Sequence, residues 1–235
     1  MHVQEFLPDE AHAGPPQQLM VLLHGAGGQP DDVGALVIML RQHWPAAAIV
    51  VPEAPEIFDA EDADPGGRQW FSGRDMSEHD LVARVGAALP PLLDYIREAQ
   101  RRLALTGTQT ALIGMDQGAI MALEASAREH DIAGRVVAFS GRFATLPTQA
   151  APAATLHLLH GGADPVIEVR HAQSAFSRLE ALGADATLDI AWEAGHELNA
   201  ELLACAIDLL QSYVPQRLWR EALSIVPQAT SGTRH

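Results

Sequence analysis

Three short segments of the chain carry residue types whose spacing is suited to hydrolysis. The segment Leu112–Ala119 (LIGMDQGA) passes from an apolar run through glycine, Asp116 and a second glycine into a helical pattern. This is the pattern of a nucleophile elbow, with Asp where Ser is usual. A strand that turns at once into a helix leaves no room for a Cβ at positions 114 and 118, which explains the two glycines. We therefore expect Asp116 to stand above the sheet, beside the positive end of the helix dipole.

The second and third segments supply a carboxylate and an imidazole. Asp164 lies in a tight loop after an apolar run (HGGADP), and His196 lies in a glycine-containing loop (AGHE) before the last helical pattern. Asp116, Asp164 and His196 thus follow the order nucleophile, acid, base of α/β-hydrolases. The loop that follows the first long strand, His24-Gly25-Ala26, is expected to supply a backbone N–H that forms an oxyanion hole with that of Gln117.

Each segment alone has a simpler interpretation. A lone Gly-x-Asp-x-Gly is a common turn, Asp-Pro often only starts a turn, and a loop histidine is usually a surface residue. The four signals at successive strand ends, in the correct order, favour the hydrolase. Ser72 and Ser140 are alternative hydroxyl nucleophiles, but neither lies on an elbow.

Other ligand sites are not supported by the spacing. The glycine-rich stretch 24–28 lacks the dinucleotide fingerprint and its acidic ribose partner. The acidic cluster 59–64 (DAEDAD) lacks the glycine and distal glutamate of an EF-hand, so a solvated loop is favoured. His157 and His160 are three apart on an expected strand and should point to opposite faces, which argues against a shared metal. No metal and no organic cofactor are expected.

Short apolar runs alternate with longer amphipathic stretches, and this alternation predicts an α/β fold with a mostly parallel sheet and helices on both faces. Expected strands are Leu19–Leu23, Ala48–Val51, Thr110–Ile113, Arg135–Phe139, Thr155–Leu159 and Ala186–Ala191; expected helices are Asp31–Trp44, Ser77–Leu105, Gln117–Glu129, Val166–Leu182 and Glu197–Tyr213.

Proline and loop signals set the expected boundaries. Pro90-Pro91 should kink or divide the long second helix. No interior segment is long enough to be a linker, and 59–67 is the most loop-like of them. We therefore expect one domain over residues 1–235, with 218–235 as a partly loose C-terminal extension.

Composition narrows the classes of partner. The 235 residues include 30 acidic and 15 basic side chains, for a net charge of −15, and the chain contains no lysine. This charge disfavours nucleic-acid binding, and the absence of lysine excludes Schiff-base and P-loop lysine chemistry. No apolar run approaches the length of a membrane span, the N-terminus does not resemble a secretory signal, and the single Cys205 permits a reducing compartment. A cytoplasmic protein without membrane insertion is expected.

The chain resembles the phospholipase/carboxylesterase family of α/β-hydrolases, especially its small bacterial esterases. The matching stretches are LLHGAGGQP, GRQWFSG, ALIGMDQGAIMALEA, RVVAFSGR, HLLHGGADPVIEV and the Gly-His of AGHELN. The resemblance implies a lidless α/β-hydrolase without a cap domain, acting on small ester substrates, with a homodimer as one expected state. It implies that Asp164 and His196 complete a triad and that Ala26 and Gln117 give the oxyanion-hole amides. It also implies that His24, Trp70 and Phe71 contact the substrate. Core packing is an equal alternative for the two aromatic residues.

Two positions depart from the family pattern. Gly28 stands where the family commonly has Asp, and this difference affects the expected shape of the His-Gly loop. Asp116 stands where the family has the nucleophilic Ser, and this difference affects the mechanism. A carboxylate is a weak nucleophile toward an ester, would give a mixed anhydride, and would place charge in the oxyanion hole.

Three hypotheses about function follow. The first is a carboxylesterase-type hydrolase of small esters or thioesters, in which Asp116 either acts as the covalent nucleophile or blocks the reaction. The second is an Asp-nucleophile hydrolase of alkyl halides or epoxides, which needs donors for the leaving group. Gln117 stands where dehalogenases frequently have Trp, and Tyr95 and Tyr213 lie in helical stretches away from the loops. The third is a catalytically silent binding protein or an inactivated variant.

Overall fold

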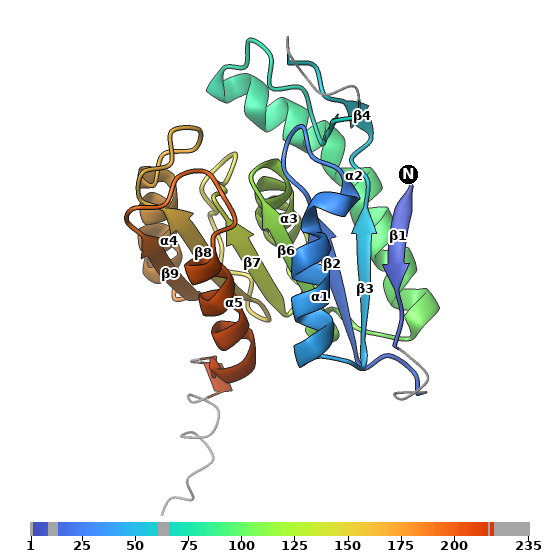
Figure 1. The fold of residues 1–235 in the computed structure, drawn as a ribbon. Helices are drawn as coiled ribbons and strands as arrows, with labels where there is room; N and C mark the ends of the chain where they lie inside the picture. Colours follow the sequence, from blue (N-terminus) through green and yellow to red (C-terminus); the bar gives the residue numbers. More distant parts are fainter. Residues whose placement is uncertain (1, 9–13, 61–65, 216, 219–235) are drawn as a thin grey trace, which may run out of the picture.

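The computed structural model describes residues 2–8, 14–60, 66–215 and 217–218. A seven-stranded sheet in the order β1-β3-β2-β6-β7-β8-β9 forms its centre, and all neighbours pair in parallel except β1 with β3 (Figure 1). This confirms the predicted α/β fold. The strands are β1 (Val3–Phe6), β2 (Gln18–Leu23), β3 (Ala47–Pro52), β6 (Thr110–Met115), β7 (Arg135–Phe139), β8 (Thr155–Gly161) and β9 (Asp185–Ala191), and β4 (Glu56–Ile57) and β5 (Arg68–Gln69) form a separate two-stranded sheet.

Helices cover both faces of the large sheet, so the interior strands are apolar on both sides (Figure 1). One core lies beneath α2, α3 and α4, and the other lies beneath α1 and α5. The helical elements are η2 (Pro30–Val33), α1 (Gly34–His43), α2 (Glu78–Leu103), η3 (Gly107–Gln109), α3 (Gln117–Arg128), α4 (Arg170–Ala181) and α5 (Ala200–Ser212).

The long helix α2 is not divided at Pro90 and Pro91, contrary to that alternative. Both prolines are exposed, and the residues four positions earlier, Gly86 and Ala87, are exposed too. The carbonyl groups that lose their N–H donors at the prolines therefore lie on the solvent side of the helix, where water can replace those donors. The apolar stripe of the opposite face runs without a break from Leu81 through Val85, Leu89, Leu92 and Ile96.

The predicted loop and the predicted C-terminal extension both include residues that the structure does not describe. The loop-like segment 59–67 connects β4 and β5, but its residues 61–65 lie outside the described part, as do residues 219–235 of the expected C-terminal extension. No described helix is long and apolar enough to cross a membrane.

Parallel pairing aligns the strand ends that carry the candidate residues. Met115 of β6 lies beside Phe139 of β7, and Gly161 of β8 lies beside Ala191 of β9. The segments that follow these strands therefore emerge at one edge of the sheet. Asp116, Asp164 and His196 all lie in those segments.

Candidate active site

Asp116 occupies a sharp turn between β6 and α3. Its backbone has φ 53° and ψ −121°, a left-handed region that is unusual for a residue other than glycine. Close packing surrounds the turn: a Cβ at Gly114 would lie 2.3 Å from the oxygen of Gly118, and a Cβ at Gly118 would lie 2.1 Å from the oxygen of Leu23. The two glycines are therefore sterically required, as the elbow pattern predicts.

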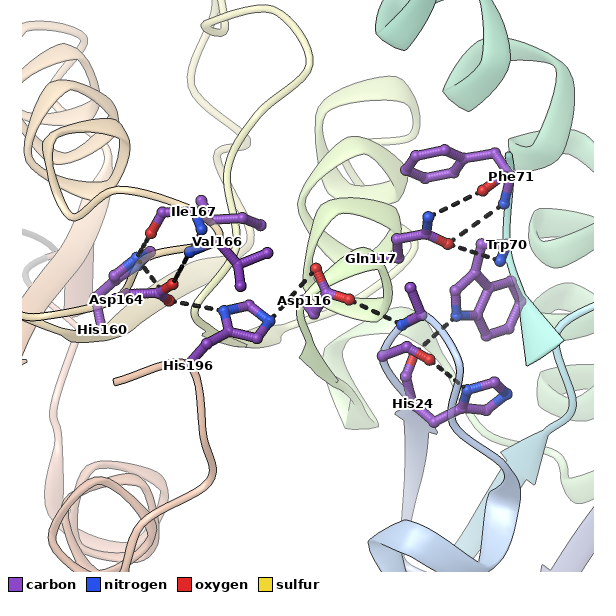
Figure 2. Close-up of polar contacts among 12 residues, drawn as sticks. His24, Trp70, Phe71, Asp116, Gln117, His160, Asp164, Val166, Ile167 and His196 are labelled. Atoms are coloured by element: carbon purple, nitrogen blue, oxygen red, sulfur yellow. Dashed lines mark hydrogen bonds and ion pairs between the residues drawn. The ribbon is translucent and has the colours of Figure 1, made fainter. Parts of the chain in front are cut away.

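The carboxylate of Asp116 lies between two groups from different loops (Figure 2). Its Oδ2 atom accepts a hydrogen bond of 2.8 Å from the backbone N–H of Ala26, and its Oδ1 atom lies 3.6 Å from Nε2 of His196. Burial raises the pKa of Asp116, while the amides of Ala26 and Gln117 and the nearby His196 oppose that rise only in part. The two predicted oxyanion-hole amides thus meet the carboxylate itself.

Asp164 and His196 form the second half of the site. Nδ1 of His196 donates to Oδ2 of Asp164 at 2.8 Å, and Oδ1 of Asp164 accepts from the amides of Val166 and Ile167 at 2.8 and 3.0 Å (Figure 2). Burial acts to raise the pKa of Asp164, but the hydrogen bonds from His196, Ile167 and Val166 outweigh it and hold that pKa below its usual value. Asp164 therefore remains ionised and fixes the orientation of the imidazole.

The loops that carry these two residues are bonded to each other. The amide of Gly162 donates to Ala191 at 2.8 Å, and the amide of Ala163 donates to Ala194 at 2.9 Å. The approach is so close that a Cβ at Gly161 would lie 2.1 Å from a backbone oxygen of the other loop. The side chains of His196 and Asp116 nevertheless remain 18% and 14% exposed, so a substrate can reach them from solvent.

His24 supports the loop that carries Ala26. Its side chain is buried, Nδ1 lies 2.9 Å from the oxygen of Gly25, and Nε2 accepts from the amide of Ala54 at 3.1 Å. The carbonyl contact requires a proton on Nδ1, so both ring nitrogens have protein partners. Burial lowers the pKa of His24, which keeps the ring neutral. The structure therefore places His24 beneath the loop, in a supporting position, although the resemblance implies a substrate contact.

Trp70 and Phe71 lie in the core, at 1% and 2% exposure. The indole N–H of Trp70 donates to the oxygen of His24 at 2.9 Å. The side-chain oxygen of Gln117 accepts from the amides of Trp70 and Phe71 at 2.9 and 3.4 Å, and its amide group donates to the oxygen of Phe71 at 2.9 Å. The two aromatic residues therefore pack in the core and brace the two segments that are expected to supply the oxyanion-hole amides.

Gly28 leaves the loop intact despite the missing Asp. Its amide donates to the oxygen of Gly25 at 3.2 Å, and its carbonyl accepts from the amide of Arg68 at 3.0 Å. A carboxylate is present nearby all the same, because Oδ2 of Asp32 lies 3.2 Å from where a Cβ of residue 28 would be.

The alternative hydroxyls lie elsewhere. Ser72 donates to Asp59 at 2.6 Å. Ser140 is fully buried after β7, beside the carboxylate of Asp164, whose pKa it helps to lower. No group of three or more potential metal ligands gathers among the described residues. His157 faces Thr187, whereas a second buried histidine, His160, faces Asp164; the sequence interpretation considered His160 only as a metal ligand.

The parallel sheet, the elbow and the ordered acid and imidazole together define an α/β-hydrolase. The chain matches the phospholipase/carboxylesterase family over residues 10–214 and belongs to that family. It is 40% identical over 210 residues to esterase YpfH of Escherichia coli (strain K12), with 89% of each chain covered.

Solved structures agree with this assignment. The fold is similar to that of esterase PE8 (TM-score 0.80, 27% identity, 90% of this chain and 98% of that chain covered). It also resembles acyl-protein thioesterase 2 of Zea mays in fold (TM-score 0.70, 20% identity, 90% and 98% covered).

Proposed function

We propose that the protein is a carboxylesterase-type hydrolase for small, uncharged esters or thioesters, in which Asp116 restricts turnover. Its membership of the phospholipase/carboxylesterase family supports this class of reaction, and so do the names of YpfH and PE8, both esterases. The site needs no cofactor for this chemistry, because a general base and two backbone donors are supplied by the chain itself.

His196 is the proposed base. Because Nδ1 carries the proton that is donated to Asp164, Nε2 of the neutral ring is free to take a proton from water or from a nucleophile. Nε2 faces residue 116 at 3.6 Å. Asp164 then stabilises the imidazolium that forms, and the amides of Ala26 and Gln117 are the proposed donors for the developing oxyanion.

The hydrogen bond between Ala26 and Oδ2 of Asp116 carries the proposal of a block. The carbonyl oxygen of an ester must reach the same amide for its developing charge to be stabilised. In this chain a carboxylate oxygen already occupies that place and brings its own negative charge. Attack by this carboxylate on an ester would moreover give a mixed anhydride, which is at least as reactive as the substrate.

Asp116→Ser tests the block directly. Serine frees the oxyanion hole and gives His196 a hydroxyl to deprotonate, so hydrolysis of p-nitrophenyl butyrate should rise by about 10²–10³-fold over the original chain. The gain should vanish in Asp116→Ser/His196→Ala and in Asp116→Ser/Asp164→Ala. Equal ester turnover by the original chain and by Asp116→Ser would overturn the block, and retained activity in both double variants would overturn the triad.

A second candidate function is displacement of a leaving group from a saturated carbon. The Asp116 carboxylate favours it, because its two oxygen atoms face different partners. Oδ1 would attack carbon and release the leaving group with its electron pair, which gives an alkyl ester of Asp116. Oδ2 is then the ester carbonyl oxygen, already bonded to Ala26. Water deprotonated by His196 would attack Cγ, and the alkoxide would leave with the proton from the imidazolium. Neither tyrosine assists, since Tyr95 lies on α2 and Tyr213 packs against His157.

Heavy-oxygen labelling separates the candidates. A single turnover of 1-bromobutane in H₂¹⁸O should leave label in the Asp116 peptide if the alkyl ester forms, with the Asp164 peptide as the unlabelled internal control. The block predicts no label and no butanol. Tight binding of an ester without turnover, in the original chain and in Asp116→Ser alike, would indicate the silent binding protein instead.

A further inference from the structure

A second histidine lies against the carboxylate that orients His196. His160 is the penultimate residue of β8 and is 1% exposed. Its Nε2 atom lies 2.7 Å from the oxygen of Ile167 and 3.5 Å from Oδ2 of Asp164 (Figure 2). Because a carbonyl oxygen only accepts, Nε2 carries a proton, and that N–H is directed at Ile167 with the Asp164 carboxylate beside it.

The contacts around Asp164 form a closed ring. Ile167 accepts from His160 through its oxygen and donates through its nitrogen to Oδ1 of Asp164 at 3.0 Å. His160 in turn lies against the other oxygen of the same carboxylate. The ring therefore anchors the turn after Asp164 to the strand that precedes it. Without that anchor, the turn that carries both amide donors of Oδ1, Val166 and Ile167, would lose its fixed position, and the carboxylate would be free to rotate away from His196.

His160 acts in its neutral form. Burial lowers the pKa of His160, and the neighbouring His196 lowers it further, although the Ile167 carbonyl and Asp164 oppose this. A neutral donor holds the loop without bringing a second positive charge to Asp164. The carboxylate thus keeps its charge for the imidazolium that forms at His196.

We propose that His160 is a positioning residue, which orients Asp164 and, through it, His196. Its role in turnover rests on the function proposed above. Its role in orientation does not, because the contact between Asp164 and His196 is observable whether or not the chain turns over an ester.

Proton NMR of the chain itself tests the orientation. The Nδ1 proton of His196, donated to a carboxylate, should give a far-downfield resonance, assigned by its absence in His196→Ala. His160→Leu removes the Nε2 donor at similar volume and should abolish or broaden that resonance. His160→Gln keeps a donor near the Nε2 position and should retain it. If the leucine variant does not fold, the more adaptable His160→Met takes its place.

Two outcomes would overturn the proposal. A resonance unchanged in a folded leucine or methionine variant would show that Asp164 needs no anchor. Loss of the resonance in the glutamine variant as well would show that ring packing, not the donor, is what matters.

Kinetics in the Asp116→Ser background add the readout on turnover. His160→Leu should lower kcat about 10–100-fold with KM nearly unchanged, and His160→Gln should recover most of the loss. A rise in KM together with a fall in kcat and lower thermal stability would instead indicate a merely structural role. If Asp116→Ser hydrolyses no ester at all, the proposed function fails while the NMR experiment still decides the role of His160.

Discussion

The Oδ2 atom of Asp116 and the backbone nitrogen of Ala26 lie 2.8 Å apart, although 90 positions separate the two residues in the sequence. The contact joins the turn after β6 to the loop after β2, which are neighbouring strands of the sheet. It places a negative charge in a buried position between backbone donors and an imidazole. Protonation and replacement of this one side chain should therefore affect both stability and reactivity.

Asp116→Asn should stabilise the protein in a pH-dependent manner. Burial raises the pKa of Asp116 in the folded state above its ordinary value of 3.8, so the folded chain holds this proton more tightly than the unfolded chain does. The protonated side chain therefore stabilises the folded state fully below pH 3.8, and this contribution is lost as pH rises through the raised pKa. Asparagine does not titrate, so its advantage should be small at pH 3.5 and larger at pH 8, with each kcal/mol raising Tm by about 2–4 °C.

Calorimetry across this pH range checks the prediction. Exposed Asp94→Asn is the matched control and should change the stability by no more than about 0.5 kcal/mol. A lower Tm for Asp116→Asn than for the original chain at pH 8 would show that the amide and imidazole contacts outweigh burial.

Two glycine substitutions should have opposite effects. Ala at Gly118 would place its Cβ 2.1 Å from the oxygen of Leu23, so the strand and helix must separate, at a cost of about 3 kcal/mol. Ala at Gly86, an exposed position in α2 with nothing within 4 Å, should gain about 0.5–1 kcal/mol by restricting the unfolded chain. Urea unfolding measures both, and a neutral Gly118→Ala would contradict the close approach.

Gln117→Leu should destabilise the fold by about 2–4 kcal/mol. The leucine leaves the buried amide of Trp70 and the buried oxygen of Phe71 without their hydrogen-bond partners. The change does not remove the backbone N–H of residue 117, so any loss arises from the side chain. Gln42→Leu, at an exposed position of α1, is the control and should stay within about 0.5 kcal/mol in the same unfolding measurement.

His157 should make the protein sensitive to acid. Burial, with the nearby Arg135, lowers the pKa of His157 from 6.5 to about 4. The unfolded chain therefore binds this proton between pH 6.5 and 4 while the folded chain does not, and stability falls by about 3 kcal/mol as pH drops through that window. The ring lies between Thr187 and Tyr213, where a phenyl ring fits without titrating.

His157→Phe isolates this contribution. Its unfolding free energy should fall less steeply between pH 7 and pH 4 than that of the original chain, by about the same 3 kcal/mol. Parallel pH curves for the two proteins would show that His157 is protonated in the fold without penalty. Carboxylates titrate in both proteins, so the comparison uses the difference between the two curves.

The fold was largely predictable because its strands are buried on both faces. Six mostly apolar runs predicted six of the seven strands of the large sheet, namely β2, β3, β6, β7, β8 and β9, although β9 is half-buried over most of its length. The edge strand β1 (VQEF) was missed because three half-exposed residues and one exposed residue carry no distinctive pattern, and only its antiparallel register with β3 makes it a strand. The two-residue strands β4 and β5 depend on each other in the same way.

The candidate site was predictable in its order but not in its contacts. Glycine spacing and chain order indicated Asp116, Asp164 and His196, because these signals are local in the sequence. The division of the Asp116 oxygens between Ala26 and His196 depends on a side-chain rotation that no spacing encodes. His160 was likewise hidden, because its contact with Ile167 depends on the path of the loop, which residue spacing does not encode.

Trp70 has a consequence for how the site can change over evolution. Its indole N–H donates to the backbone oxygen of His24 on one side of the proposed oxyanion hole, and its backbone N–H donates to the side-chain oxygen of Gln117 on the other. A new side chain at Trp70 would remove the bond to the backbone oxygen of His24, and a new side chain at Gln117 would remove the acceptor of the Trp70 amide. Natural variation at Trp70 and Gln117 should therefore be coordinated, and a designer who wishes to widen the hole would need to redesign these two residues together.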